Sequence, residues 1–419
     1  MAKQVKQLGI AQGSLGFNDS DKLQKTVDFI LDTYDIQKAM YDPAKIAIYY
    51  KDKSLGDGLV DFDRISLDLA EYGITIGDAI LRKILRSDKY IKSFNPITEF
   101  FDKIRGTFSG ESQIELLAKH LIARQWEDQP EGYYQQRAAK LLRKWLVACV
   151  ACWKDGHPND VMLTLIQMKE GVGKTYFTEW IVPDRLKEYY IKSNSRPDRF
   201  DMEDAFTRNM IVCFDEMVGL TKGTADTFKQ TIASNVLWVK RRNDEFPVGR
   251  PRLACAIGTT NHNQELNGFI QECFGYRRFG CIELLDINRD YSSLIDKNVL
   301  WAEALMLYEN SSFDYQFKQE DFDEFKAYNQ RYVVEYPALK YVRLYVSHPT
   351  GSECEETQML NPTEICKLLR DRNKINREDL LHVNPQKVGA ALTSLGFIQK
   401  SDRSEGSTPR YRYHVVINI

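Results

Sequence analysis

No stretch of this sequence is apolar over a length sufficient to cross a bilayer. The longest apolar run, WLVACVACW, covers only residues 145–153, whereas a membrane-spanning helix needs about 20 apolar residues. The first residues, MAKQVKQLG, also lack the hydrophobic segment of a signal peptide. We therefore expect a cytoplasmic protein that has no membrane partner.

The sequence also lacks a large excess of either charge, with 57 Lys and Arg against 59 Asp and Glu. This balance excludes a protein that coats nucleic acid through bulk charge, so any nucleic-acid contact must come from local basic patches. The eight cysteines lack the spacing of a zinc site or a disulfide framework. Cys149 and Cys152 form one CxxC inside an apolar helical run, and we interpret both as core residues.

The 419 residues are enough for two or three domains. We interpret residues 1–20 as a loose N-terminal segment. Apolar residues at three- and four-residue spacing then predict an all-helical domain over 21–126, suited to oligomerisation as a collar. Its expected helices include 77–87, 96–104 and 111–126.

Three short, continuous apolar runs mark the centre of the chain: VMLTLI (161–166), MIVCF (210–214) and LACAIGTT (253–260). Strands without polar alternation are covered on both faces, as in a parallel sheet between layers of helices. Helix-compatible segments separate the runs. The pattern predicts an α/β domain over 127–312.

The first of these runs leads into QMKEGVGKT, which fits a phosphate-binding loop. A strand, a glycine loop and a helix in succession place backbone N–H groups around a phosphate. Lys174 would reach the β- and γ-phosphates of ATP, and the Thr175 hydroxyl would hold Mg²⁺. Met168 replaces the first glycine of the strict GxxxxGK[ST] pattern, which removes no phosphate ligand. The predicted nucleotide-binding residues are Glu170, Gly171, Val172, Gly173, Lys174, Thr175 and Tyr176.

The second and third runs end in polar residues that suit hydrolysis. Asp215 would bind Mg²⁺ and Glu216 would polarise the attacking water, although an acidic pair can also simply end a strand in solvent. Asn261 would orient the water, although an isolated asparagine at a strand end is usually a turn former. Their order after the phosphate loop favours the catalytic interpretation.

Two basic segments complete the predicted motor. Arg277 and Arg278 in GYRRFG can form surface ion pairs, or one can act as an arginine finger on a neighbouring subunit's γ-phosphate. The segment VLWVKRRNDEFPVGRPR predicts a hairpin with Lys240, Arg241 and Arg242 near its tip. These three are candidate DNA contacts in the channel of a ring. The alternatives are a solvated turn and a contact with a neighbour's nucleotide.

The last part of the chain, 313–419, predicts a winged-helix-like domain. NPTEICKLLRDRN and NPQKVGAALTSLGF have the capping residues of two short helices, and FIQK with RYRYHVVINI predicts a hairpin. Five basic residues belong to the second helix and the hairpin: Lys387, Lys400, Arg403, Arg410 and Arg412.

In this order, GVGKT, FDEMVGL, GTTN and GYRRF resemble the characteristic stretches of the virulence-associated E family and the related superfamily 3 helicase-like ATPases of phages and mobile elements. The resemblance covers residues 65–312. It implies an α/β fold with an AAA+-type P-loop NTPase core. It also implies that the protein assembles into a homo-oligomeric ring, a hexamer, and that this ring moves 3′-to-5′ on DNA. The catalytic residues that it implies are Lys174, Asp215, Glu216, Asn261 and Arg277 or Arg278.

We therefore expect an ATP- and Mg²⁺-dependent ring motor that acts on single-stranded or forked DNA. A replicative helicase of a phage or mobile element, working with replication partner proteins, fits best. The alternative is an ATP-driven loader or remodelling ATPase of a replication or anti-phage defence complex that unwinds nothing. A nucleotide-controlled DNA-binding regulator is disfavoured by Glu216 and the arginine pair.

Overall fold

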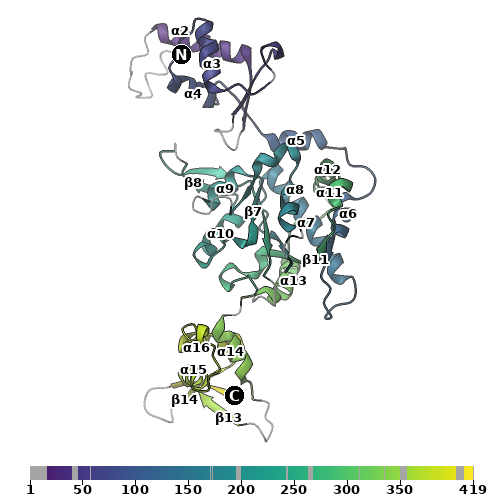
Figure 1. The fold of residues 1–419 in the computed structure, drawn as a ribbon, viewed down its shortest axis with the longest axis vertical. Coiled ribbons are helices and arrows are strands. Elements are labelled where there is room, and N and C mark those ends of the chain that lie inside the picture. Colours follow the sequence, from purple (N-terminus) through teal and green to yellow (C-terminus); the bar gives the residue numbers. More distant parts are fainter. Residues whose placement is uncertain are drawn as a thin grey trace. The chain divides into compact units, whose positions relative to one another are not determined.

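The structure is a computed structural model. It describes residues 17–39, 46–56, 58–169, 171, 173–194, 200–241, 244–262, 268–310, 312–334, 336–349, 356–402 and 410–418. Of the predicted site residues, Glu170, Val172 and Arg242 lie outside the described residues, and so does Arg403. The chain forms two compact units, Met1–Asn261 with Arg277–Phe325, and His262–Tyr276 with Lys326–Ile419. Figure 1 labels their helices and strands.

The N-terminal part contains a small sheet as well as helices, so the prediction of an all-helical domain over 21–126 is wrong. Ile30, Ile65 and Leu81 belong to its buried core. The segment YDIQKA forms a strand although its apolar alternation is limited to Tyr34 and Ile36, because pairing with IAIYY decides its conformation. The helices are α2 (Phe17–Thr33), α3 (Phe62–Glu71) and α4 (Asp78–Arg86), and the strands, in the order β2-β1-β3, are β2 (Ile46–Tyr50), β1 (Tyr34–Ala39) and β3 (Ser93–Phe94).

The central core begins earlier in the chain than the expected residue 127. Helices α5 (Pro96–Ile104) and α6 (Gln113–His120) contribute Phe101 and Leu117 to it. The expected helix over 111–126 ends at His120 because the chain continues as a strand, β4 (Leu121–Ala123), which pairs antiparallel with a central strand. That pairing is a long-range contact that local periodicity does not reveal.

The central sheet has six strands, of which five are parallel and β4 is antiparallel. All three predicted runs are strands and are buried along their length, as expected for a sheet with helices on both faces. In sheet order they are β4, β11 (Phe279–Ile287), β5 (Met162–Ile166), β10 (Cys255–Thr260), β7 (Ile211–Phe214) and β6 (Tyr190–Lys192).

Helices pack on both sides of this sheet, with α9 and α10 on one side of β7 and α7 and α8 on the other (Figure 1). The apolar run 145–153 lies within α7 and is almost wholly buried, and its Cys149 and Cys152 are core residues as predicted. Among the described residues, no group of His, Cys, Asp and Glu is suited to hold a metal by itself. The helices are α7 (Tyr133–Asp155), α8 (Lys174–Trp180), α9 (Met202–Arg208), α10 (Ala225–Ala233), α11 (Tyr291–Leu294) and α12 (Lys297–Glu309).

The second unit contains both predicted capped helices and the predicted hairpin. Asn361 and Glu364 form the expected capping box at the first helix. Helix α13 (Gln319–Asn329) spans the division between the units. The remaining elements are α14 (Pro337–Tyr345), α15 (Pro362–Asp371), α16 (Pro385–Ser394), β12 (Val346–Ser347), β13 (Thr357–Leu360), β14 (Gln399–Asp402) and β15 (Arg410–Ile417), with β15 paired to the other three strands.

Candidate functional site

The predicted nucleotide residues meet at the carboxyl edge of the central sheet. Strand β10 lies between β5 and β7 and is parallel to both, with Thr260 opposite Ile166 and Gly258 opposite Phe214. The residues that follow these three strands therefore share one edge, which is where ligands bind in open α/β sheets.

Lys174 is buried at this edge, and its ammonium group donates hydrogen bonds to oxygen atoms of two separate segments. It donates to the carbonyl of Gln167 at 2.9 Å and to Oδ1 of Asn261 at 2.6 Å. Lys174 and Asn261 are 87 positions apart in the chain, so the fold alone brings them together. The loop before Lys174 needs glycine at Gly171 and Gly173, because their φ angles are 76° and 108°.

Asp215 receives hydrogen bonds from three elements. Thr175 and Thr259 donate their hydroxyls to Oδ1 at 2.8 and 2.6 Å, and Asn194 donates its amide to Oδ2 at 3.2 Å. Burial by itself would raise the pKa of Asp215, but these hydrogen bonds outweigh it and hold the pKa below its usual value. The carboxylate is therefore kept ionised beside the phosphate loop.

Glu216 has an unusual backbone conformation. Its φ is 50°, in the left-handed region that non-glycine residues rarely adopt, and Met217 follows with φ 56°. Such a conformation costs of order 1–3 kcal/mol and persists only where the surroundings impose it. The Glu216 N–H donates to the Thr259 hydroxyl at 3.1 Å, and the side chain is exposed at the site edge.

Arg289 is a site residue that the sequence analysis missed. It follows β11, the other neighbour of β5, and its guanidinium donates to the carbonyl of Gly171. A Cβ on Gly173 would lie 2.8 Å from the Arg289 Nε, so the side chain lies directly against the phosphate loop. The signal available in the sequence was its position just after a fourth parallel strand. Tyr176, on α8, is half exposed.

Arg277 and Arg278 lie at the opposite edge of the sheet. They precede β11, whose first residue, Phe279, pairs with the first residue of β5. A five-residue strand separates that edge from the phosphate loop, roughly 15 Å. Burial lowers the pKa of Arg278, and the adjacent charge of Arg277 lowers it further. The Arg277 side chain is exposed.

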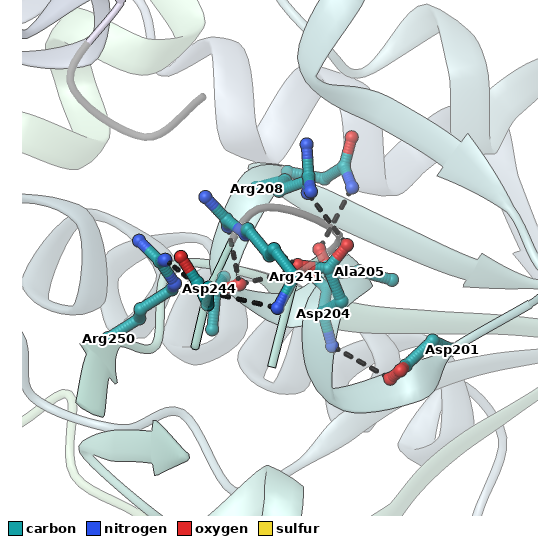
Figure 2. A network of polar contacts seen from close by, with 9 residues as sticks. Asp201, Asp204, Ala205, Arg208, Arg241, Asp244 and Arg250 are labelled. Atoms are coloured by element: carbon teal, nitrogen blue, oxygen red, sulfur yellow. Dashed lines mark hydrogen bonds and ion pairs between the residues drawn. The ribbon is translucent and has the colours of Figure 1, made fainter. Parts of the chain in front are cut away.

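The predicted basic hairpin is formed by β8 (Val236–Val239) and β9 (Val248–Pro251), which pair antiparallel. Lys240 is exposed. Arg241 instead turns back to α9, where it donates to Asp204 Oδ1 at 2.8 Å and to the Thr207 hydroxyl at 3.0 Å. Figure 2 shows this network, with Arg208 also on Asp204 and Arg250 on Asp244.

Arg241 lies in the loop between β8 and β9, near the hairpin tip as predicted, but its side chain is only 10% exposed. The Arg241 side chain attaches the hairpin to α9 through Asp204 and Thr207. Asp204 neutralises the guanidinium, which a buried charge requires. The hairpin is also fixed at its base. There the buried Arg252 donates to the carbonyls of Ile232 and Asn159 at 2.8 and 2.9 Å.

Residues 110–334 match the family profile of the virulence-associated protein E-like domain. The match covers more than half of the 419 residues. The chain belongs to the virulence-associated protein E-like family. The predicted family is thus confirmed. The virulence-associated protein E-like domain contains all the predicted site residues, and it starts just before α6, in agreement with the early start of the central core.

Solved structures similar to this virulence-associated protein E-like chain include three of the apo C-terminal region of NrS-1. For the first, residues 305–718, the identity is 13%, the TM-score is 0.48, and 94% of this chain and 99% of that chain are covered. For an A form of that region, the identity is 11%, the TM-score is 0.44, and 96% of this chain and 100% of that chain are covered. For another A form, the identity is 11%, the TM-score is 0.47, and 95% of this chain and 99% of that chain are covered. No curated protein matches the chain. No helix of the described residues is both long and apolar enough to cross a membrane.

Proposed function

We propose that this protein is a Mg²⁺-dependent ATPase with an AAA+-type core. The observation that carries the proposal is the meeting of three separate motifs at one sheet edge. There the Lys174 ammonium contacts Asn261 at 2.6 Å, and the Thr175 hydroxyl contacts Asp215 at 2.8 Å. Packing does not require a cation, a hydroxyl, a carboxylate and an amide in one place, whereas phosphoryl transfer uses each of them.

The strand order supports the AAA+-type core. The strand that carries the polar sensor, β10, separates the phosphate-loop strand β5 from the acid-bearing strand β7. Two strand spacings, about 10 Å, separate the ends of β5 and β7. We expect the γ-phosphate and the attacking water to occupy this interval, with Asn261 orienting that water.

Thr175 and Asp215 suit Mg²⁺. Hydroxyl and carboxylate oxygens are the hard donors that this ion takes. The hydrogen bond of 2.8 Å between Thr175 Oγ1 and Asp215 Oδ1 brings one donor of each kind together, and these two residues would hold the ion. The low pKa of Asp215 keeps the carboxylate charged for this purpose. Bound Mg²⁺ would neutralise charge on the phosphates.

Each of the protein's own site residues then has a separate role in hydrolysis. Lys174 exchanges its contacts with Gln167 and Asn261 for the β- and γ-phosphates, and this exchange frees the Asn261 amide to orient water. Glu216 polarises that water. Arg277 and Arg278 lie at the far edge of the same subunit, so neither can reach that subunit's own γ-phosphate, and a finger from this pair would have to come from a neighbour. That geometry favours a homo-oligomeric ring, for which we propose a hexamer.

We further propose that the ring acts on single-stranded or forked DNA as a phage or mobile-element replicative helicase. Helices α15 and α16 with the hairpin β14–β15 would serve as a winged helix. The test is ATP hydrolysis by the purified protein with and without Mg²⁺, followed by strand separation on a forked DNA. No Mg²⁺-dependent hydrolysis would overturn the ATPase proposal. Hydrolysis without strand separation would favour the loader or remodelling ATPase.

Lys240 and Arg241, the two described members of the predicted DNA-contact set, should behave differently when each is replaced. We expect Lys240→Ala to weaken single-stranded DNA binding and to reduce its salt slope by about 0.7, because one phosphate contact is lost. Arg241→Ala should lower the thermal unfolding temperature, since Asp204 loses one of its two arginine partners and keeps only Arg208. Binding titrations at several salt concentrations and calorimetry distinguish the two effects. An unchanged salt slope for Lys240→Ala would remove this residue from the DNA contact.

A further inference from the structure

The arrangement of the site sets the direction in which a bound nucleotide must run. Glu216 and Asn261, which would act at the γ-phosphate, follow β7 and β10 on one side of β5. Lys174 follows β5 itself. The γ-phosphate must therefore point toward β10, and the α-phosphate and nucleoside must leave on the opposite side, toward β11. Arg289 lies on that side.

Arg289 already contacts the phosphate loop from there. Its Nη2 donates to the Gly171 carbonyl, and its Nε and Cζ would lie 2.8 and 3.3 Å from a Cβ at Gly173. The side chain is nevertheless exposed. The guanidinium therefore contacts the loop in a side chain that is exposed to solvent.

The turn that carries Arg289 is held firmly. The N–H of Asn288 donates to the His120 carbonyl at 3.0 Å. Tyr291, which is fully buried, packs its ring against Trp180 and Phe177 of α8, with centroids 4.6 and 5.7 Å apart. Because α8 follows the phosphate loop directly, both the loop and the turn that carries Arg289 are anchored to α8. A side chain presented in this way can position a ligand at little entropic cost.

We propose that Arg289 is the nucleoside clamp of this site. The guanidinium keeps its hydrogen bond to Gly171 and lays its planar face against the purine base of the bound nucleotide. A guanidinium is suited to this because it is planar, stacks on aromatic faces and donates hydrogen bonds in its own plane at the same time. Arg289 is thus a positioning residue that orients the nucleotide. The inference rests on the proposed ATP site.

The test compares ligands that have and lack a nucleoside. Calorimetric titration of the full chain with ATP, ADP and inorganic tripolyphosphate, each with Mg²⁺, gives three dissociation constants. We expect Arg289→Ala to weaken ATP and ADP binding about tenfold, a loss between those of an exposed and a fully desolvated cation–π contact. Tripolyphosphate binding should not change, because this ligand has no base to stack.

An equal loss for all three ligands would assign Arg289 to the phosphates or to the loop itself and overturn the clamp. No loss for any ligand would overturn it as well. Wild-type protein that binds none of the three would instead contradict the ATP site, so the two failures are distinguishable. Arg289→Lys keeps the charge without the plane and should also weaken ATP binding severalfold; full affinity would show that a point charge suffices. Arg185→Ala, an exposed arginine within Asp184–Tyr189, is the matched control, and thermal unfolding checks that each variant folds.

Discussion

Lys174→Ala should abolish both ATP binding and ATP hydrolysis, with a fall in kcat/KM of at least about 10²–10³. The ammonium group is the cation that the phosphate loop brings into contact with Asn261 at this sheet edge. Removing it takes away a charge that would contact the phosphates in both the ground state and the transition state. Because the loss includes ground-state contacts, binding must fall together with the rate.

Glu216→Gln is the matched variant for this prediction. The replacement amide would have nearly the same shape as the carboxylate but could not polarise water, so hydrolysis should fall while ATP binding is retained. Equilibrium titration and steady-state kinetics separate the two variants. Retention of hydrolysis by Lys174→Ala would contradict the site. Since the buried Lys174 ammonium also satisfies the Gln167 carbonyl, thermal unfolding must show that this variant is folded.

The central sheet and much of the candidate site could be predicted because their signals are local. VMLTLI, MIVCF and LACAIGTT are apolar throughout, and each is followed by residues with phosphate or metal chemistry. Helix ends were equally predictable where a capping residue is present. Asn95 followed by Pro96 opens α5, and Asn361 with Glu364 opens α15.

The remaining features depend on contacts between distant residues. YDIQKA becomes a strand through its partner IAIYY, and LIA becomes one through β11. Arg289 has no motif of its own and reaches the site only because β11 lies beside β5. Arg241 belongs to a basic run in the sequence, yet the acid that pairs with it, Asp204, is 37 positions away. Charge in a sequence does not show where a neutralising partner will lie.

Arg277→Ala should lower ATP hydrolysis by about 10³-fold or more, the effect of removing an arginine finger, while ATP binding by each subunit is retained. We assign the finger to Arg277 because its side chain is exposed, whereas Arg278 is half-buried and burial lowers its pKa. Arg278→Ala is the paired variant. It should act mainly on stability, measured by thermal unfolding.

The finger can be tested by mixing two inactive variants. Arg277 and the phosphate loop lie at opposite ends of parallel strands, roughly 15 Å apart, so one subunit cannot use both at once. A ring that contains Arg277→Ala and Lys174→Ala subunits has interfaces where an intact phosphate loop meets an intact Arg277 from its neighbour. At those interfaces activity should return, to a maximum near equal proportions of the two variants. The control is a mixture of Lys174→Ala with Glu216→Gln, in which every subunit keeps Arg277. Each subunit of this mixture lacks either Lys174 or Glu216 in its own ATP site, so the control should remain inactive. If the first mixture also stays inactive while both variants still assemble, Arg277 does not act across the interface. The proposal of a ring would then lose the observation that supports it.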